Sequence, residues 1–144
     1  MKVNVFRLCR PRKCRFPSQA LISRAVELAL GRAAGGREVN VIFCGAAKII
    51  SLNRAFLGKN RITDVIAFGY GGPAEKNGLP CGDIYVCVPQ GERQAAAYGN
   101  SRQDELLTLC VHGALHLSGM DDATPAQRAR MDKAASRVIA AARA

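Results

Sequence analysis

The sequence lacks tryptophan, and its aromatic side chains are limited to five phenylalanines and three tyrosines among 144 residues. A platform that stacks single-stranded bases on aromatic rings is therefore poorly supported. No apolar run approaches the ~20 residues of a membrane-spanning helix. The segment 1–6 lacks the long apolar region of a signal peptide and is predicted to be part of a first strand. We therefore expect a cytoplasmic protein with no membrane partner.

The sequence also lacks any C-x-x-C pair, although it contains six cysteines. Several of these cysteines lie in apolar strand or helix patterns, as small hydrophobic side chains do. We expect free thiols. Pairing or metal binding by Cys9 with Cys14, or by Cys81 with Cys87, is the alternative, and the spacing is not diagnostic of either.

Acidic residues are few: 11 Asp and Glu stand against 21 Lys and Arg, for a net charge of +10. Such a surplus in a small domain favours a polyanionic partner such as nucleic acid. A basic surface that is merely solvated is the alternative. The length is sufficient for one domain with a substantial core that needs no disulfides. We therefore expect residues 1–144 to form a single domain.

Hydrophobic periodicity predicts helices interleaved with strands. Ser18, Ser101 and Thr124, the last followed by Pro125, are typical helix-start signals. These features predict an α/β (or α+β) domain in which about five helices pack on a small mixed sheet of about four strands. The helix that starts after Ser101 is apolar on most sides and should be central. The predicted strands are 2–8, 38–44, 62–68 and 83–88; the predicted helices are 19–30, 46–57, 89–98, 102–118 and 125 to near the C-terminus, with a glycine- and proline-rich loop at 69–82.

Both histidines of the chain lie in the predicted central helix, four residues apart at His112 and His116. Residues at this spacing share one helix face, so two imidazoles can bind one cation. Gly119 can turn the chain back, which could bring the carboxylate of Asp122 to the ion. The resulting H-x3-H-x2-G-x2-D pattern supplies three ligands for one Zn²⁺ per chain and leaves a fourth position open, as in catalytic sites. The alternatives are a purely structural role for the histidines and a cap or turn role for Asp122.

Other residues carry two interpretations each. Gly113 occupies the position where helical zinc proteases place a glutamate general base, which disfavours a metalloprotease-like hydrolase. This glycine either leaves space beside a metal or allows close packing of a strand. Asp64 either ties a local turn or accepts a proton from a metal-binding histidine. The basic, proline-broken loop 10–15 either contacts phosphates or is simply exposed.

Several sequence blocks, taken in order, resemble the YbeY endoribonuclease family of bacterial rRNA maturation factors from about Val39 onward. The resemblance implies a metal-dependent endoribonuclease, specific for single-stranded RNA, that acts in maturation of the 16S rRNA 3′ end and in ribosome biogenesis. It implies rRNA and the ribosome or ribosomal proteins as partners. The blocks are Leu52-Asn53, Thr63-Asp64-Val65-Ile66-Ala67-Phe68, Gly82-Asp83-Ile84-Tyr85-Val86, Glu105-Leu106, and Val111-His112-Gly113-Ala114-Leu115-His116-Leu117 with Gly119 and Asp121.

The chain departs from the family pattern at three positions. The third histidine of the family falls on Asp122, an active-site arginine falls on Leu57, and a serine falls on Ala67. An aspartate oxygen is an acceptable zinc ligand. The substitution nevertheless lowers the charge of the bound site by one unit, which weakens the metal as a Lewis acid. Candidates to replace the missing arginine are the nearby cations Arg54, Lys59 and Arg61.

Phosphodiester cleavage requires a nucleophile and stabilisation of the charge that develops on the phosphate. We expect His112, His116 and Asp122 to hold zinc, which would activate a water or polarise the phosphate. Lys59 and Arg61 are candidate phosphate contacts, with ordinary solvated turn residues as the alternative. The competing hypothesis is a catalytically impaired factor of the same fold that binds rRNA or the ribosome.

Overall fold

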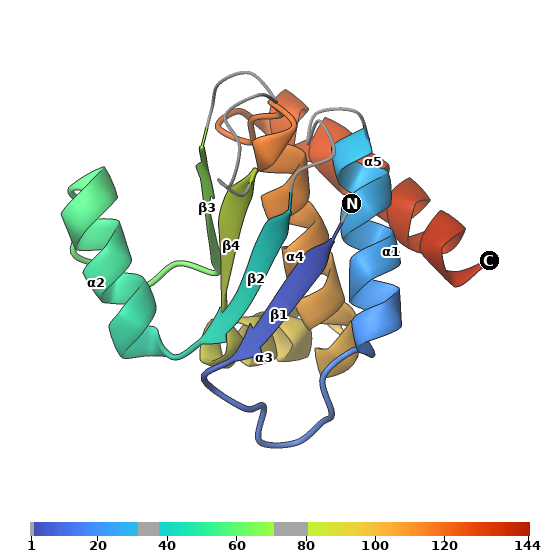
Figure 1. Ribbon diagram of the computed structural model, residues 1–144. Coiled ribbons are helices and arrows are strands. Elements are labelled where there is room, and N and C mark those ends of the chain that lie inside the picture. Colours follow the sequence, from blue (N-terminus) through green and yellow to red (C-terminus); the bar gives the residue numbers. More distant parts are fainter. Residues whose placement is uncertain (1, 32–37, 71–80) are drawn as a thin grey trace.

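The computed structural model describes residues 2–31, 38–70 and 81–144. Strands and helices interleave along these segments and form one α/β domain (Figure 1). The predicted fold class is therefore confirmed, as are the predicted helices and strands apart from small shifts at their ends. The strands are β1 (Val3–Arg7), β2 (Val39–Cys44), β3 (Val65–Gly69) and β4 (Gly82–Cys87); the helices are α1 (Gln19–Leu30), α2 (Ala46–Leu57), α3 (Val88–Tyr98), α4 (Arg102–Leu117) and α5 (Pro125–Arg143).

The four strands form one mixed sheet in the order β1-β2-β4-β3. β1, β2 and β4 are parallel, and β3 runs antiparallel to β4 at the sheet edge. Parallel neighbours need crossover connections, and α1 and α2 lie in those connections. The carboxyl ends of the three parallel strands consequently lie together at one end of the sheet, at the bottom of Figure 1, and α1, α2 and α3 begin there.

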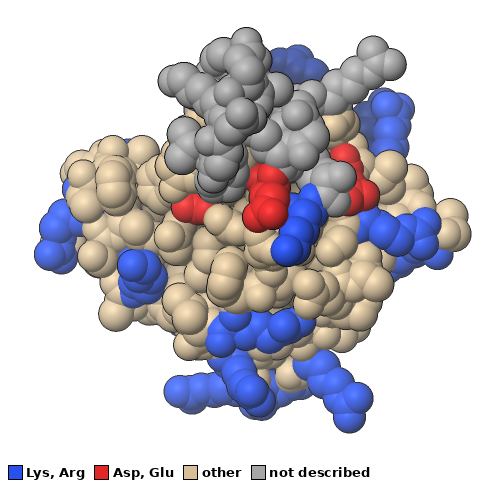
Figure 2. Space-filling model, viewed as in Figure 1, with Lys and Arg blue, Asp and Glu red and all other residues tan. Residues whose placement is uncertain are grey.

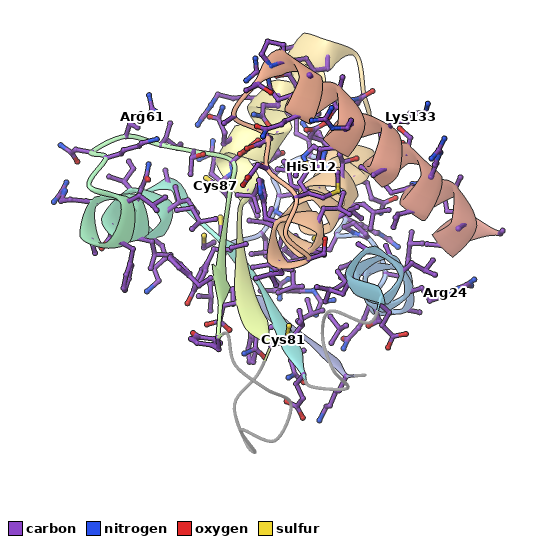
Figure 3. The ribbon with its side chains drawn as sticks, turned by 90° about the horizontal axis from the view of Figure 1, so that it is seen from above. Arg24, Arg61, Cys81, Cys87, His112 and Lys133 are labelled. Atoms are coloured by element: carbon purple, nitrogen blue, oxygen red, sulfur yellow. The ribbon has the colours of Figure 1, made fainter. Side chains whose placement is uncertain are left out.

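The sheet is covered on both faces. Alternate residues of β4 face opposite sides: Ile84 and Val86 belong to the main core with α1, α4 and α5, whereas Cys87 belongs to a smaller core beneath α2, against which Tyr85 packs. Figure 3 shows α2 on one side of the sheet and α4 and α1 on the other. A sheet with both faces covered must have apolar residues on both faces, which explains the near-continuous apolar run of β2.

The predicted start signals cap their helices. The hydroxyl groups of Ser18, Ser101 and Thr124 accept hydrogen bonds from backbone N–H groups in the first turns of α1, α4 and α5. Each bond satisfies a donor that the helix itself leaves unpaired. In α5, the Gln127 side chain also accepts the Thr124 backbone N–H, which completes a capping box.

α4 is the central helix, as predicted, and nine of its residues are buried. It approaches the sheet closely at Gly113, where a Cβ atom would overlap the Cγ2 atom of Ile84 and lie 3.2 Å from the Cγ2 atom of Val65. Of the two interpretations of Gly113, close packing against a strand is therefore correct. The absence of a side chain allows α4 to lie directly on β3 and β4.

β3 begins at Val65 rather than at residue 62 as predicted. The side-chain Oδ1 atom of Asp64 accepts the N–H of Val65 at 2.8 Å, and its backbone carbonyl accepts the N–H of Cys87 at 2.8 Å. Asp64 thus ties the entry of the strand, as the local interpretation predicted. The alternating pattern before it belongs to an irregular segment.

Two further predictions concern the loop and the cysteines. Gly69 and Gly82, the ends of the predicted loop, lie in β3 and β4, and residues 71–80 of that loop lie outside the described residues. All six cysteines are free thiols. Among the helices that the structure describes, none is long and apolar enough to span a membrane.

Candidate functional site

The two histidines lie on one face of α4 near its C-terminal end. Both side chains are mostly buried, with 19% of His112 and 27% of His116 exposed. Their backbone is fixed by the packing of the helix on the sheet one residue beyond His112. The helix therefore presents two imidazoles from a rigid support, as the spacing predicted.

The chain reverses immediately after α4. Gly119 has a φ of 107°, a conformation that favours glycine. Its N–H donates to the His116 carbonyl, and the N–H of Met120 donates to the Leu115 carbonyl, both at 3.0 Å. This return places the Oδ2 atom of Asp122 3.4 Å from the Nε2 atom of His116. The predicted turn thus brings these two side chains together.

A backbone contact orients the His116 ring. The Nδ1 atom lies 3.0 Å from the Met120 carbonyl oxygen, which can only accept, so the proton of a neutral ring belongs on Nδ1. Nε2 is then the atom with a free lone pair, the arrangement typical of metal-binding histidines. Arg128 holds the same segment by donating to the carbonyl groups of Asp122 and Ala123 at 3.4 and 3.3 Å.

His112 faces a different carboxylate. Its Nε2 atom lies 3.6 Å from the Oδ1 atom of Asp132, on α5. This distance exceeds a hydrogen bond, and Nε2 is buried without a hydrogen-bond partner. Burial lowers the pKa of His112, while the charges of Asp132 and Asp64 oppose that shift. Asp132 was not predicted as a site residue. It lies on the last helix, next to the buried Met131, and only the packing of α5 on α4 brings it near His112.

A hollow of about 840 Å³, here called the acidic hollow, opens between α3, α4 and α5 beside His112. Glu105 on its floor is only 4% exposed and accepts a hydrogen bond from Asn100 at 3.3 Å. Burial raises the pKa of Glu105. Gln94 donates to the Oδ2 atom of Asp64 at 3.2 Å. The acidic residues that line this hollow are Asp64, Asp104, Glu105, Asp122 and Asp132.

A second hollow of about 390 Å³, here called the basic hollow, lies beside His116. Lys59 and Arg61 line it, together with Leu57 and Ala67. Two of the three positions at which the sequence analysis expected a departure from the family pattern therefore lie in the same hollow as the two predicted phosphate contacts. Figure 3 shows the turn after α2, which carries Arg61, running across to the sheet edge beside α4.

The buried side chain of Asn53 holds the basic turn. Its Nδ2 atom donates to the Arg61 carbonyl at 3.0 Å, and the backbone carbonyl of Asn53 accepts the N–H of Lys59 at 3.2 Å. The sequence marked Asn53 only as part of a family block, and its position explains its role. Arg54 instead donates to the Asn60 side chain at 2.6 and 3.1 Å, and it does not line the basic hollow. Of the three candidate replacement cations, Lys59 and Arg61 are therefore the two beside His116.

In the portion of the chain that the structure describes, no three His, Cys, Asp or Glu side chains are gathered closely enough to form a ready metal site. Of the predicted ligands, His116 pairs with Asp122, whereas His112 lies beside Asp132, which was not predicted. Their chemistry fits zinc, which takes imidazole nitrogen and carboxylate oxygen. The buried, unpartnered Nε2 atom of His112 is the kind of atom that a cation would satisfy.

Comparisons with known proteins identify the family of the chain. The family model described as Endoribonuclease YbeY matches residues 12–143. Endoribonuclease YbeY of Elusimicrobium minutum is 43% identical over 96% of this chain and 98% of its own length. The protein of that name from Chlorobaculum tepidum is 37% identical over 78% of this chain and 80% of its own length.

A solved structure is similar as well. The solution structure of TM1509 from Thermotoga maritima matches 98% of this chain and 91% of its own chain, with a TM-score of 0.58 and 27% sequence identity. The match confirms the fold over nearly the whole chain. Taken together, the similarities in sequence and structure place the chain in the endoribonuclease YbeY family, whose named activity is that of an RNA-cleaving hydrolase.

Proposed function

We propose that this protein is a zinc-dependent endoribonuclease that cleaves single-stranded RNA at the junction of the acidic and basic hollows. One observation carries the proposal: His112 and His116, one helical turn apart, line the acidic and the basic hollow respectively. Their Nε2 atoms face carboxylates at 3.6 and 3.4 Å rather than hydrogen-bond donors. An imidazole lone pair and a carboxylate oxygen repel each other unless a cation or a proton lies between them.

In this proposal His112, His116 and Asp122 hold the zinc ion, and Asp132 supplies a further oxygen on the side of His112. A zinc ion supplies a Lewis acid and lowers the pKa of a coordinated water to about 7. Met120 keeps the proton of His116 on Nδ1 and so keeps Nε2 available. Arg128 restrains the backbone at Asp122, which reduces the reorganisation needed to bring its carboxylate to the ion.

The basic hollow is the place for the phosphate. Lys59 and Arg61 are exposed and lie on a turn that the buried Asn53 side chain holds by a hydrogen bond to the Arg61 carbonyl. Their charges would attract the scissile phosphodiester to His116 and stabilise the negative charge that develops during cleavage. Leu57 lies where the family resemblance implies an arginine. In this proposal Lys59 and Arg61 therefore provide the charge stabilisation that the arginine would otherwise share.

The finer part of the proposal concerns the substrate. We propose rRNA, with maturation of the 16S 3′ end as the reaction and the ribosome or ribosomal proteins as partners. Support comes from the family and from the net charge of +10, which favours a polyanion. A cut inside a chain also requires RNA to pass through the site, and His112 and His116 give the site access to both hollows.

Zinc content is the decisive measurement. Purified wild-type protein should contain about one zinc ion per chain by elemental analysis. Asp122→Ala should lose zinc or bind it at least about 10-fold more weakly, whereas Glu27→Ala, which removes an exposed carboxylate on α1, should retain it. Wild-type protein that takes up no zinc when zinc is resupplied would overturn the proposal.

A catalytically impaired RNA-binding factor is the second candidate, and the residues of the basic hollow favour it. Leu57 and Ala67 both line that hollow in place of polar residues of the family. A binding factor should keep its RNA affinity after metal removal with EDTA and should leave single-stranded rRNA fragments intact. Cleavage that disappears with EDTA and returns with zinc would exclude it.

A further inference from the structure

Cationic side chains crowd the loop between β1 and α1. Residues 1–26 contain seven Lys and Arg and no Asp or Glu. Five of these cations lie within nine residues, all are exposed, and none forms an ion pair with a carboxylate in the parts of the chain that the structure describes. They are Arg7, Arg10, Arg12, Lys13 and Arg15, here called the loop cations.

The loop is held in place, and one of the loop cations, Arg7, lies over the Phe16 ring at 5.4 Å from the ring centroid. The N–H groups of Leu8 and Cys9 donate to the Phe43 carbonyl, and the Phe16 ring packs 4.7 Å from the Phe43 ring. Glu92 accepts the backbone N–H of Arg12 at 3.2 Å. Gln103 donates to the carbonyl groups at residues 15 and 16. These contacts use backbone and ring atoms, so the loop cations are presented on an ordered backbone and lose less freedom when they bind.

Helix ends add to the positive field at the same edge. α1, α2 and α3 all begin at the carboxyl ends of the parallel strands, beside this loop (Figure 1). None has an acidic residue in its first turn, and the N-caps of α2 and α3 make no side-chain capping bond. Helix N-termini carry partial positive charge. Lys48 lies exposed in the first turn of α2, where an acid would normally be favoured.

The distribution of charge on the molecular surface agrees with a positive field at this loop. Figure 2 shows Lys and Arg side chains gathered along the lower edge of the molecule, over the loop between β1 and α1, with no Asp or Glu among them. Phe6 and Leu8 alternate with the cations and are 48% and 68% exposed. The cations can follow a nucleic-acid backbone, and Phe6 offers one exposed ring on which a base can stack.

We propose that the loop cations form a second RNA-binding surface that holds the substrate strand away from the cleaved bond. This inference rests on the proposed function, because an endonuclease substrate continues in both directions from the bond that is cut. α3 connects the two places: Glu92 contacts the loop, and Gln94, half a turn further on, contacts Asp64 in the acidic hollow. A single strand that leaves the histidines and passes around α3 reaches the loop cations.

The partner is RNA rather than a lipid surface. Four of the five loop cations are arginines, whose planar guanidinium groups bind phosphate in a bidentate manner. The surface is formed by a loop and helix ends, and within the described residues it contains no amphipathic helix with a broad apolar face of the kind that lies in a bilayer.

The test compares two triple variants with equal loss of charge. Arg10→Ser/Arg12→Ser/Lys13→Ser removes three loop cations, and Arg130→Ser/Lys133→Ser/Arg137→Ser removes three exposed cations of α5. The probe is a fluorescein-labelled, 2′-O-methyl 30-nucleotide strand, which resists cleavage, and binding is followed by fluorescence anisotropy from 50 to 300 mM salt.

The loop variant should bind this strand about 10-fold or more weakly than the wild type at low salt. Its slope of log K against log salt should fall by about two, since each single-strand phosphate contact contributes about 0.7. The α5 variant should change far less.

The outcomes separate this surface from the proposed function. Equal losses in the two triple variants would mean that only net charge matters, and an unchanged loop variant would likewise overturn the proposal. Binding of the loop to anionic phospholipid vesicles, with RNA affinity unaffected, would overturn it in favour of a membrane. Shortening the RNA substrate to 4 nucleotides should abolish the difference, so that the wild type and both variants cleave it equally. If no RNA is cleaved at all while the loop-dependent affinity persists, the proposed function fails and the surface stands.

Discussion

The two hollows beside the end of α4 differ in charge although they share one helix. The acidic hollow is lined by five carboxylates and two arginines, and the basic hollow by two cations and one carboxylate. His112 lines the hollow that contains most of the carboxylates, and His116 lines the hollow that contains Lys59 and Arg61, with Asp122 3.4 Å from its Nε2 atom. This division supports a cation held from one side and a phosphate held from the other, with the histidines between them. A purely structural pair of histidines would require no such separation.

Removal of His116 is the strongest way to break this arrangement. His116→Ala takes away the imidazole that lies against both Asp122 and the basic hollow, and we expect RNA cleavage to fall more than about 100-fold, beyond the effect of losing a residue that only supports a ligand. RNA binding, measured with a non-cleavable strand, should stay within about twofold, because the cations remain. Cleavage as fast as that of the wild type would contradict the enzyme hypothesis.

Removal of the cations tests the other side. Lys59→Ser/Arg61→Ser should lower the cleavage rate about 10-fold or more, since a hydrogen bond to a charged group contributes about 1.5 kcal/mol. Zinc content should not change. Lys133→Ser/Arg137→Ser on the outer face of α5 provides a control with the same charge. If the two double variants cleave equally well, Lys59 and Arg61 are ordinary solvated turn residues.

Addition of a cation should sharpen the contrast. Leu57 is 53% exposed and lines the basic hollow, so an arginine fits there without burial of charge. Leu57→Arg should raise the cleavage rate up to about 10-fold by adding a charged donor near the phosphate. Leu28→Arg, at an exposed leucine on α1, should have no effect. Slower cleavage by Leu57→Arg would contradict this prediction and would show that the basic hollow works best with the charge of Lys59 and Arg61 alone.

The smallest expected effect is on stability. Burial lowers the pKa of His112 from its ordinary value of 6.5, so the unfolded chain binds a proton more readily than the folded chain. Below that ordinary value, the stability of metal-free protein should fall as the pH drops. Urea unfolding in EDTA at pH 7.5 and 5.5 would measure this loss, and His112→Gln should reduce it. Glu105 acts in the opposite direction, because its raised pKa favours the folded state in acid.

Much of the fold could be predicted because periodicity and caps are local signals. Ser101 and Thr124 start their helices where the sequence placed them. The start of β3 was three residues off, because Ile62 to Asp64 alternate like a strand while the Asp64 side chain occupies the first backbone donor. Local patterns do not reveal such side-chain bonds.

The site was predictable where it follows from one segment, and not where it depends on packing. His112, His116, Gly119 and Asp122 lie within eleven residues, and a helix followed by a turn is sufficient to relate them. Asp132 meets His112 only because α5 folds back along α4. The path of the turn after α2 likewise determines that Lys59 and Arg61, but not Arg54, line the hollow beside His116. Spacing in the sequence contains no information on such contacts.

The contact between Gly113 and Ile84 has a consequence for the reactions that this fold can acquire. Any side chain at position 113 would enter the sheet, so a glutamate there would require the helix to move away from β3 and β4. A single substitution therefore cannot convert the two-histidine helix into a peptide-cleaving one. The packing of the core restricts the evolution of the site, and new proton-transfer groups can arise only from the loops and helices around its rim.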